Sequence, residues 1–117
     1  CALPILVEGS TDIGGTRTSI AMQFAEVLGL AAEDINPSVG DTSAIGYTDV
    51  TGGSRTTYAT GWAAFEAAND VMAQMIDRAA RLWGVAIAEV EFEDGVFGQR
   101  LVDLDRGTLR VDRRGVG

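Results

Sequence analysis

Histidine and lysine are both missing from the 117-residue sequence, and its single cysteine, Cys1, is the first residue. Without histidine, the chain cannot build the common zinc sites, a Ser/His pair or a Cys/His pair from its own residues. One cysteine also excludes an internal disulfide. The sequence therefore excludes several large classes of hydrolase and zinc enzyme as activities of this chain alone.

Long hydrophobic runs and a basic surface are missing as well. No apolar stretch approaches the roughly 20 residues that a membrane-spanning helix needs. The formal net charge of −8 opposes binding to nucleic acid, whose phosphates attract basic surfaces. With 46% hydrophobic residues, the composition is typical of a globular chain. We therefore expect a soluble, cytoplasmic protein that binds neither membranes nor nucleic acid.

One pattern of glycine, arginine and hydroxyl residues occurs twice. Residues 9–19 read GSTDIGGTRTS and are called the first repeat; residues 46–57 read GYTDVTGGSRTT and are called the second repeat. Thr51 is an insertion in the second repeat. Arg17 and Arg55 are the only cations among residues 1–77, and each lies inside one repeat. The positive charge of this part of the chain is thus confined to the repeats.

The hydrophobic pattern predicts alternating strands and helices. Apolar periodicity and turn residues predict strands at 3–8 and 86–95 and helices at about 17–28 and 56–83. They also predict a short strand or extended segment within 33–46, which Pro37 confines to a sheet edge or a strand start. Asp94-Gly95 indicates a hairpin, with residues 108–112 as the candidate return strand. This order predicts an α+β fold (α/β two-layer), with residues 1–117 forming a single domain or sub-domain.

Both repeats lead directly into a predicted helix, where the first backbone amides lack intrahelical partners and attract anions. Paired glycines let a ligand approach the backbone, hydroxyls can donate to phosphate oxygens, and arginine offers a bidentate fork. Two such helix starts close together would suit a ligand with two phosphates. Ordinary turn formation and helix capping would also explain the pattern. We expect Asp12 and Asp49, at matching positions, to close turns rather than to bind a metal.

Two longer segments carry a family resemblance. VEGSTDIGGTRTSIAMQFAEVLGL and DTSAIGYTDVTGGSRTTYATGWAAFEAANDV resemble the molybdopterin-binding large subunit of the xanthine dehydrogenase and aldehyde oxidase family of molybdenum hydroxylases, best over residues 5–94. The resemblance implies a fragment of a bacterial oxidoreductase that helps to hold molybdopterin, usually in its cytosine dinucleotide form. It implies no catalytic residue and no metal ligand within this chain. The implied cofactor-binding residues are Gly14, Gly15, Thr16, Arg17, Thr18, Ser19, Gly52, Gly53, Ser54, Arg55, Thr56 and Thr57.

The resemblance also implies what this chain needs from outside. The family's large subunit is several times longer, and its iron–sulfur and flavin partners are not part of this sequence. We therefore expect the chain alone to be inactive and to work with the remainder of a molybdenum hydroxylase. Two alternatives stay open. One is a catalytically inactive small domain that forms a homo-oligomer through the 56–83 helix and holds no cofactor; the other is a small anion or nucleotide binder unrelated to molybdenum.

Overall fold

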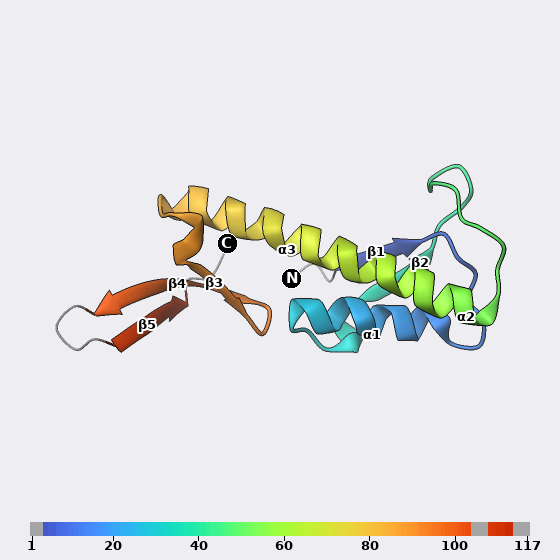
Figure 1. The fold of residues 1–117 in the computed structure, drawn as a ribbon, viewed down its shortest axis with the longest axis horizontal. Helices are drawn as coiled ribbons and strands as arrows, with labels where there is room; N and C mark the ends of the chain where they lie inside the picture. Colours follow the sequence, from blue (N-terminus) through green and yellow to red (C-terminus); the bar gives the residue numbers. More distant parts are fainter. Residues whose placement is uncertain (1–3, 104–107, 114–117) are drawn as a thin grey trace. The chain divides into compact units, whose positions relative to one another are not determined.

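The computed structural model describes residues 4–103 and 108–113, and the side chains of residues 4–100. It confirms the predicted α+β class, with helices and two separate small sheets in sequence (Figure 1). The chain divides into two compact units, Cys1–Asn69 and Asp70–Gly117. Within the described residues, no helix is both long and apolar enough to cross a membrane.

The first unit contains a strand–helix–strand motif. β1 (Ile5–Glu8) and β2 (Asn36–Val39) pair in parallel, and α1 (Thr16–Leu28) lies between them in the chain. Alternate residues of a strand face opposite sides, and β1 accordingly buries Leu6 and Glu8. Pro37 is the second residue of β2, which confirms the predicted edge position, because both strands of a two-stranded sheet are edges.

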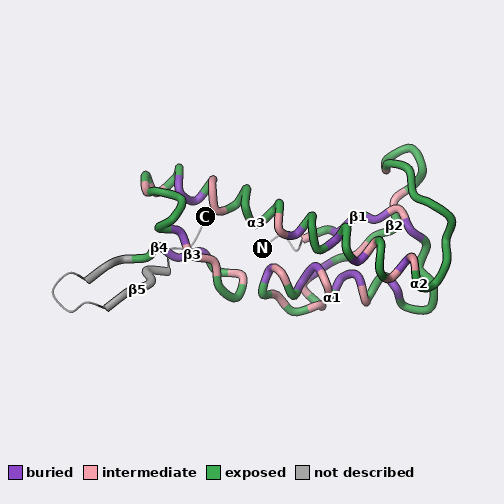
Figure 2. Tube along the Cα trace, in the orientation of Figure 1, coloured by how far each residue is buried: buried purple, intermediate pink, exposed green. Residues whose placement is uncertain are grey.

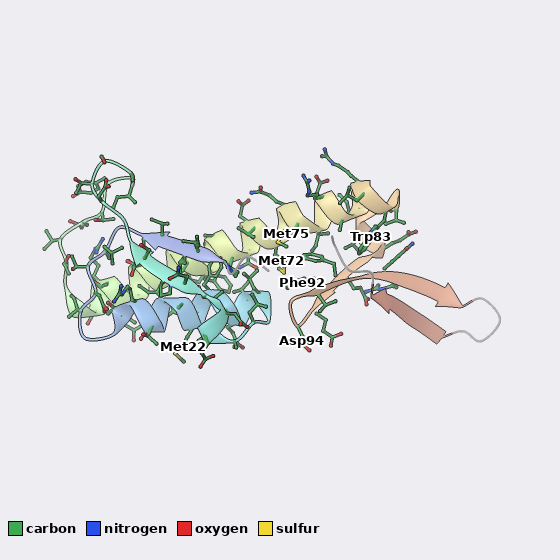
Figure 3. All side chains as sticks on the ribbon, turned by 180° about the vertical axis from the view of Figure 1, so that it is seen from behind. Met22, Met72, Met75, Trp83, Phe92 and Asp94 are labelled. Atoms are coloured by element: carbon green, nitrogen blue, oxygen red, sulfur yellow. The ribbon has the colours of Figure 1, made fainter. Side chains whose placement is uncertain are left out.

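α1 forms where the apolar spacing predicts a helix. Ile20 and Phe24 fall on its buried side, four residues apart. Met22 is 56% exposed and points away from the sheet, as Figure 3 shows. Gly29 ends the helix in the left-handed conformation, with φ 60°, which glycine adopts without steric cost. The amphipathic pattern therefore sets which face of α1 covers β1 and β2.

The second helix begins earlier than predicted and changes its winding. Residues 53–83 form α2 (Gly53–Arg55), a π-helical turn η2 (Thr56–Thr60) and α3 (Gly61–Trp83) without interruption. At Gly61 this helix passes very close to α1, since a Cβ built there would lie 1.8 Å from Oε1 of Gln23. A residue without a side chain permits this approach within the first unit.

The second unit has its own core. The end of α3 contributes Ala79 and Ala80, and strands β3 (Val90–Glu93) and β4 (Val96–Asp103) contribute Val90 and Phe97. Figure 2 shows buried stretches in purple near the end of α3 and in β3, and Figure 3 places Trp83 on the helix and Phe92 on the strand. The rings of Phe92 and Phe97 lie 4.7 Å apart between centroids. Partly buried side chains around this core are Ile76, Trp83, Val85 and Phe92.

The hairpin of the second unit differs from the prediction in its pairing. Asp94-Gly95 does form the turn, with φ values of 49° and 74°, but the strand that returns from it is β4. Residues 108–112 belong to β5 (Thr108–Arg113), which pairs with β4 instead. The proposed return strand is therefore wrong. β4 was overlooked because VFGQRLVD does not alternate cleanly between apolar and polar residues.

The strand before this turn is also shorter than predicted. Residues 87–89 form a 3₁₀ turn, so β3 begins only at Val90. Ala88 is exposed rather than part of a buried strand face. Strand pairing begins at Val90, opposite Gln99. The alternation of apolar and polar residues therefore extends to positions that have no partner strand.

Candidate functional site

The two repeats lie side by side in the first unit, at the end where α1 and α2 begin (Figure 1). Oγ1 of Thr11 donates to Oγ1 of Thr51 at 3.4 Å, although the two residues are 40 positions apart. Thr48 Oγ1 donates to the carbonyl oxygen of Gly9 at 3.3 Å. These bonds bring the flanks of both helix starts together, which the sequence alone did not establish.

The first repeat satisfies most of its own polar groups. Asp12 Oδ1 accepts hydrogen bonds from the amides of Gly15 at 3.0 Å and Arg17 at 3.4 Å, and Oδ2 accepts from Arg17 Nε at 3.1 Å. Thr16 Oγ1 accepts from the amide of Ile13 at 2.8 Å. Asp12 therefore closes a turn, as predicted, and also pairs with the arginine of its repeat.

The hydrogen bonds to Asp12 stabilise its ionised form. Partial desolvation acts to raise the pKa of Asp12, but bonds from the Arg17 amide and guanidinium, the Gly15 amide and the Thr16 hydroxyl outweigh it. The net effect lowers the pKa of Asp12 below its ordinary value of 3.8. Asp12 thus stays charged at neutral pH and holds Arg17 in place.

The second repeat lacks this internal cap. Gly52 is the N-cap of α2, its backbone is extended, and no side chain bonds to the helix start. Within the described residues, the amides of Gly53, Ser54 and Arg55 have no acceptor, since the first bond of this helix runs from Thr56 N to Gly52 O. From the residues that the structure describes, Asp49 Oδ1 accepts one hydrogen bond, from the adjacent amide of Val50 at 2.7 Å. The helix start therefore presents free donors.

Thr51 explains why the two repeats differ. It places one extra residue between Asp49 and the glycine pair, so this carboxylate does not reach the helix start as Asp12 does. The two repeats also differ in burial. Thr18 is exposed, whereas its counterpart Thr56 is 0% exposed, and its Oγ1 has no hydrogen-bond partner in the part of the chain that the structure describes. Two copies of one sequence pattern thus present different groups to solvent.

A cavity of about 550 Å³ lies beside the second repeat, within the first unit. This volume falls within the roughly 300–1,000 Å³ range of small-molecule sites. Its lining comes from β1, from residues 47–49 and from the helix between Arg55 and Ala67. Most of the walls are apolar. The polar side chains among the lining residues are Glu8, Ser10, Tyr47, Thr48, Asp49, Arg55 and Thr60.

Glu8 and Arg55 carry unpaired polar atoms in this cavity. Glu8 is 6% exposed, and neither of its carboxylate oxygens has a hydrogen-bond partner among residues 4–100, whose side chains the structure describes. Arg55 Nη1 likewise has no partner there. Burial raises the pKa of Glu8, and the negative charge of Asp12 raises it further, while Arg17 lowers it. By contrast, Ser10 Oγ and Thr60 Oγ1 satisfy each other at 2.7 Å.

Sequence reasoning missed Glu8. The available signal was its position two residues after the buried Leu6, on the inward side of a strand. All twelve residues assigned from the resemblance lie in the first unit, and Arg55 alone among them lines the cavity. The remaining ones are grouped by exposure: Gly14, Gly15, Arg17, Thr18, Gly52, Gly53 and Ser54 are exposed, Ser19 and Thr57 are half-buried, and Thr16 and Thr56 are buried.

Comparisons with known proteins agree with the resemblance. A sequence model described as "Molybdopterin cofactor-binding domain" matches residues 5–112, beyond the predicted limit at 94. Among solved structures, the Cu,Mo-CO dehydrogenase in its carbon monoxide reduced state is similar, with 32% identity and a TM-score of 0.66. The alignment covers 92% of this chain but 13% of that chain. A comparison with curated proteins found no match.

Proposed function

This chain belongs to the molybdopterin cofactor-binding domain family, and on that premise we propose that its second repeat binds the phosphates of a molybdopterin dinucleotide. The free amides of Gly53, Ser54 and Arg55 at the start of a 53–83 helix carry this proposal. An anion bound there would accept hydrogen bonds from these three N–H groups and would also interact with the positive end of the helix dipole.

The groups at the second repeat fit a phosphate chemically. Phosphate oxygens only accept hydrogen bonds, and this helix start offers amides, hydroxyls and a guanidinium that forms no ion pair with a carboxylate of the described residues. A Cβ built on Gly52 or Gly53 would meet no atom within 4 Å, so both glycines border open space. A ligand can therefore approach the backbone closely.

The first repeat would form the other side of the same site. We assign cofactor contacts to its exposed Gly14, Gly15 and Thr18 and to the half-buried Ser19. Thr16 and Arg17 stabilise the conformation of the first repeat by donating hydrogen bonds to Asp12. The half-buried Thr57 completes the set on the helix of the second repeat, whereas Thr56 is 0% exposed and supports the helix start from below. The pyrophosphate-bridged cytosine dinucleotide form suits two adjacent helix starts better than a single phosphate.

The chain spans 13% of the CO dehydrogenase chain that it matches. We therefore propose that it serves as one part of a larger molybdenum hydroxylase, acting on an aldehyde or N-heterocycle, with the catalytic residues outside this chain. The bound molybdenum cofactor supplies the redox chemistry of such an enzyme. This chain would bind and orient it, and by itself would hydroxylate nothing.

Self-association is a second proposal, favoured by one observation. Trp62 is 64% exposed and stacks on Phe65, with ring centroids 5.2 Å apart. Tyr58, on the same helix, is also exposed. Exposed aromatic residues of this kind mark interaction surfaces. A homo-oligomer through this helix, or contact with the rest of a hydroxylase, would cover them.

The amide assignment can be tested with Gly53→Pro. Proline lacks the N–H but suits the first position of a helix, and the extended backbone of Gly52 suits a residue before proline. Calorimetric titration of the full chain with CDP should show binding that weakens about tenfold, because one charge-assisted hydrogen bond is lost. Gly53→Ala keeps the N–H and should bind like the wild type. Equal binding by the proline variant would refute the assignment.

A further inference from the structure

The outer edge of β1 has no partner strand among the described residues, because the first sheet contains β1 and β2 alone. The carbonyl oxygen of Glu8 faces β2, since it accepts from the amide of Gly40 at 2.8 Å. Backbone groups alternate in direction along a strand, so the N–H and C=O groups of Ile5 and Val7 point away from β2. These donors and acceptors form a row with which another strand can pair.

The outer edge of β2 is different. The amide of Asn36 donates to the carbonyl oxygen of Pro4 at 2.8 Å, so residue 36 faces β1 and residue 37 faces outward. That residue is Pro37, which has no N–H to offer. Proline and charged side chains commonly protect open sheet edges from pairing, and β1 has neither at Ile5 or Val7. The sequence thus closes the edge of β2 and leaves that of β1 open.

One face of this sheet is uncovered as well. Leu6 and Glu8 are buried on the inner face, whereas Ile5 and Val7 are 67% and 54% exposed on the outer face. Parallel sheets are normally covered on both faces, and a sheet usually needs three or more strands for independent stability. The first sheet is therefore incomplete within the described residues.

We propose that the outer edge of β1 binds an extended strand from the remainder of a molybdenum hydroxylase. The main chain of this strand pairs with Ile5 and Val7, and its apolar side chains pack beside theirs. The inference rests on the proposed function in one respect, that this chain is one part of a larger enzyme. The similar CO dehydrogenase chain is far longer, since the alignment covers 13% of it, so a strand can come from outside the matched region.

A strand without a helix behind it fits this edge better than a second copy does. The 53–83 helix lies beside β1 on the side away from β2, because the residues between them include Leu6 and Glu8 but none of β2. Oγ of Ser10, just after β1, also bonds to Oγ1 of Thr60 at 2.7 Å. Two copies that paired through β1 about a two-fold axis would each bring this helix under the same strands. A single added strand meets no such obstacle.

Charge adds a second feature of the partner. Residues 1–77 contain ten carboxylates and two arginines, so this part of the chain is strongly acidic. Opposite charges favour association, and a strand with basic residues at its ends is attracted where an acidic one is repelled. The partner strand is therefore apolar and β-branched along its length, with basic flanks.

Hydrogen exchange on the wild-type chain tests the proposal. The probe is the blocked peptide Lys-Thr-Val-Thr-Val-Thr-Val-Lys, and its control carries proline in place of every valine. In the chain alone, the amides of Ile5 and Val7 should exchange faster than those of Leu6 and Glu8. Millimolar probe should slow exchange at Ile5 and Val7 by about tenfold, the protection expected when the edge is paired nine-tenths of the time. The control peptide should have no effect, and no slowing by the probe overturns the proposal.

Val7→Pro is the decisive variant, and Val39→Pro is its matched control. Each removes the outward-facing amide of a valine, from the edge of β1 or of β2 respectively. Val7→Pro should abolish the protection of Ile5 by the probe, whereas Val39→Pro should retain it. Protection that appears at Val39 instead would place the strand on β2 and overturn the proposal. Circular dichroism establishes that each variant is folded, and the wild-type comparison stands if Val7→Pro is not.

The outcomes also separate a second copy and the proposed function. Protection of Ile5 and Val7 that rises with chain concentration in the absence of peptide would identify a second copy as the partner and overturn the single strand. Binding of CDP depends on the start of the 53–83 helix and not on this edge. Probe binding without CDP binding would leave the edge and refute the phosphate site, and the reverse result would do the opposite.

Discussion

Asp12 binds Arg17 twice, through the guanidinium Nε at 3.1 Å and the backbone amide at 3.4 Å. Arg55, at the matching position of the second repeat, has no carboxylate partner among the described residues, and its Nη1 is buried and unpaired. The two arginines of residues 1–77 therefore have different roles. One stabilises a turn, and the other is available to a ligand.

Asp12→Asn should destabilise the chain in a pH-dependent way. The folded-state pKa of Asp12 lies below 3.8, so its contribution to stability is present above that pH and is lost as the pH falls through the folded-state value. Thermal unfolding followed by circular dichroism should show a lower Tm for the variant at pH 7. The gap to wild type should close below pH 3.8. A constant gap across this range would contradict the charge-based explanation.

Glu8→Gln should have the opposite effect. The folded-state pKa of Glu8 is raised above 4.5, so its favourable contribution exists below pH 4.5 and is lost as the pH rises through the folded-state value. Near pH 7 the ionised group is buried without a partner, and its replacement by a neutral amide should raise Tm. Thermal melts from pH 4 to pH 8 should show the gain growing with pH. Glu26→Gln, an exposed change on α1, controls for the lost charge.

These two carboxylates also mark the limit of sequence reasoning. Local periodicity predicted β1, α1 and the long helix, because the spacing of apolar residues reflects which face is buried. The inward position of Glu8 depends on α1 and the second helix packing around β1, which no local pattern reports. The different roles of the two repeats follow from one inserted residue, Thr51, whose effect appears only once each helix start is located.

The pairing of the strands in the second unit could likewise not be predicted from local sequence patterns. Asp94-Gly95 identified the turn, but the identity of its return strand depended on contacts between β4 and its two neighbours. The expectation that residues 1–117 form a single domain or sub-domain stays a prediction. The chain forms two compact units, and α3 continues from the first into the second.

The close approach of Gly61 to Gln23 predicts a coupled effect. Gly61 has helical φ and ψ values, so alanine there should gain about 1 kcal/mol of helix propensity. Its Cβ would, however, meet the end of the Gln23 side chain. We expect Gly61→Ala to be near neutral alone and stabilising in a Gln23→Ala background. Urea unfolding of the four proteins measures this coupling, and additive effects would show that Gln23 moves aside without cost.

The exposed Trp62 and Phe65 predict that the isolated chain associates. Light scattering after size exclusion should report a mass above 12.3 kDa that rises with concentration. Trp62→Ser should shift the chain toward monomer, because it removes the most exposed large ring of the stacked pair. Met22→Ser changes an apolar residue that is 56% exposed on α1 and should not alter the mass. A monomeric wild type would refute self-association through this helix.

The two arginines provide the sharpest test of the site, because their substitution removes the same charge from matching positions. Arg55→Gln should weaken CDP binding about tenfold, since a guanidinium contact to a phosphate oxygen is lost. Arg17→Gln should weaken it by less than about threefold, because Asp12 already occupies that guanidinium and only long-range attraction is reduced. Arg17→Gln should instead lower Tm at neutral pH. Equal losses of affinity from the two variants would mean that the repeats contribute equally, and that the internal pairing of Arg17 with Asp12 opens when the ligand binds.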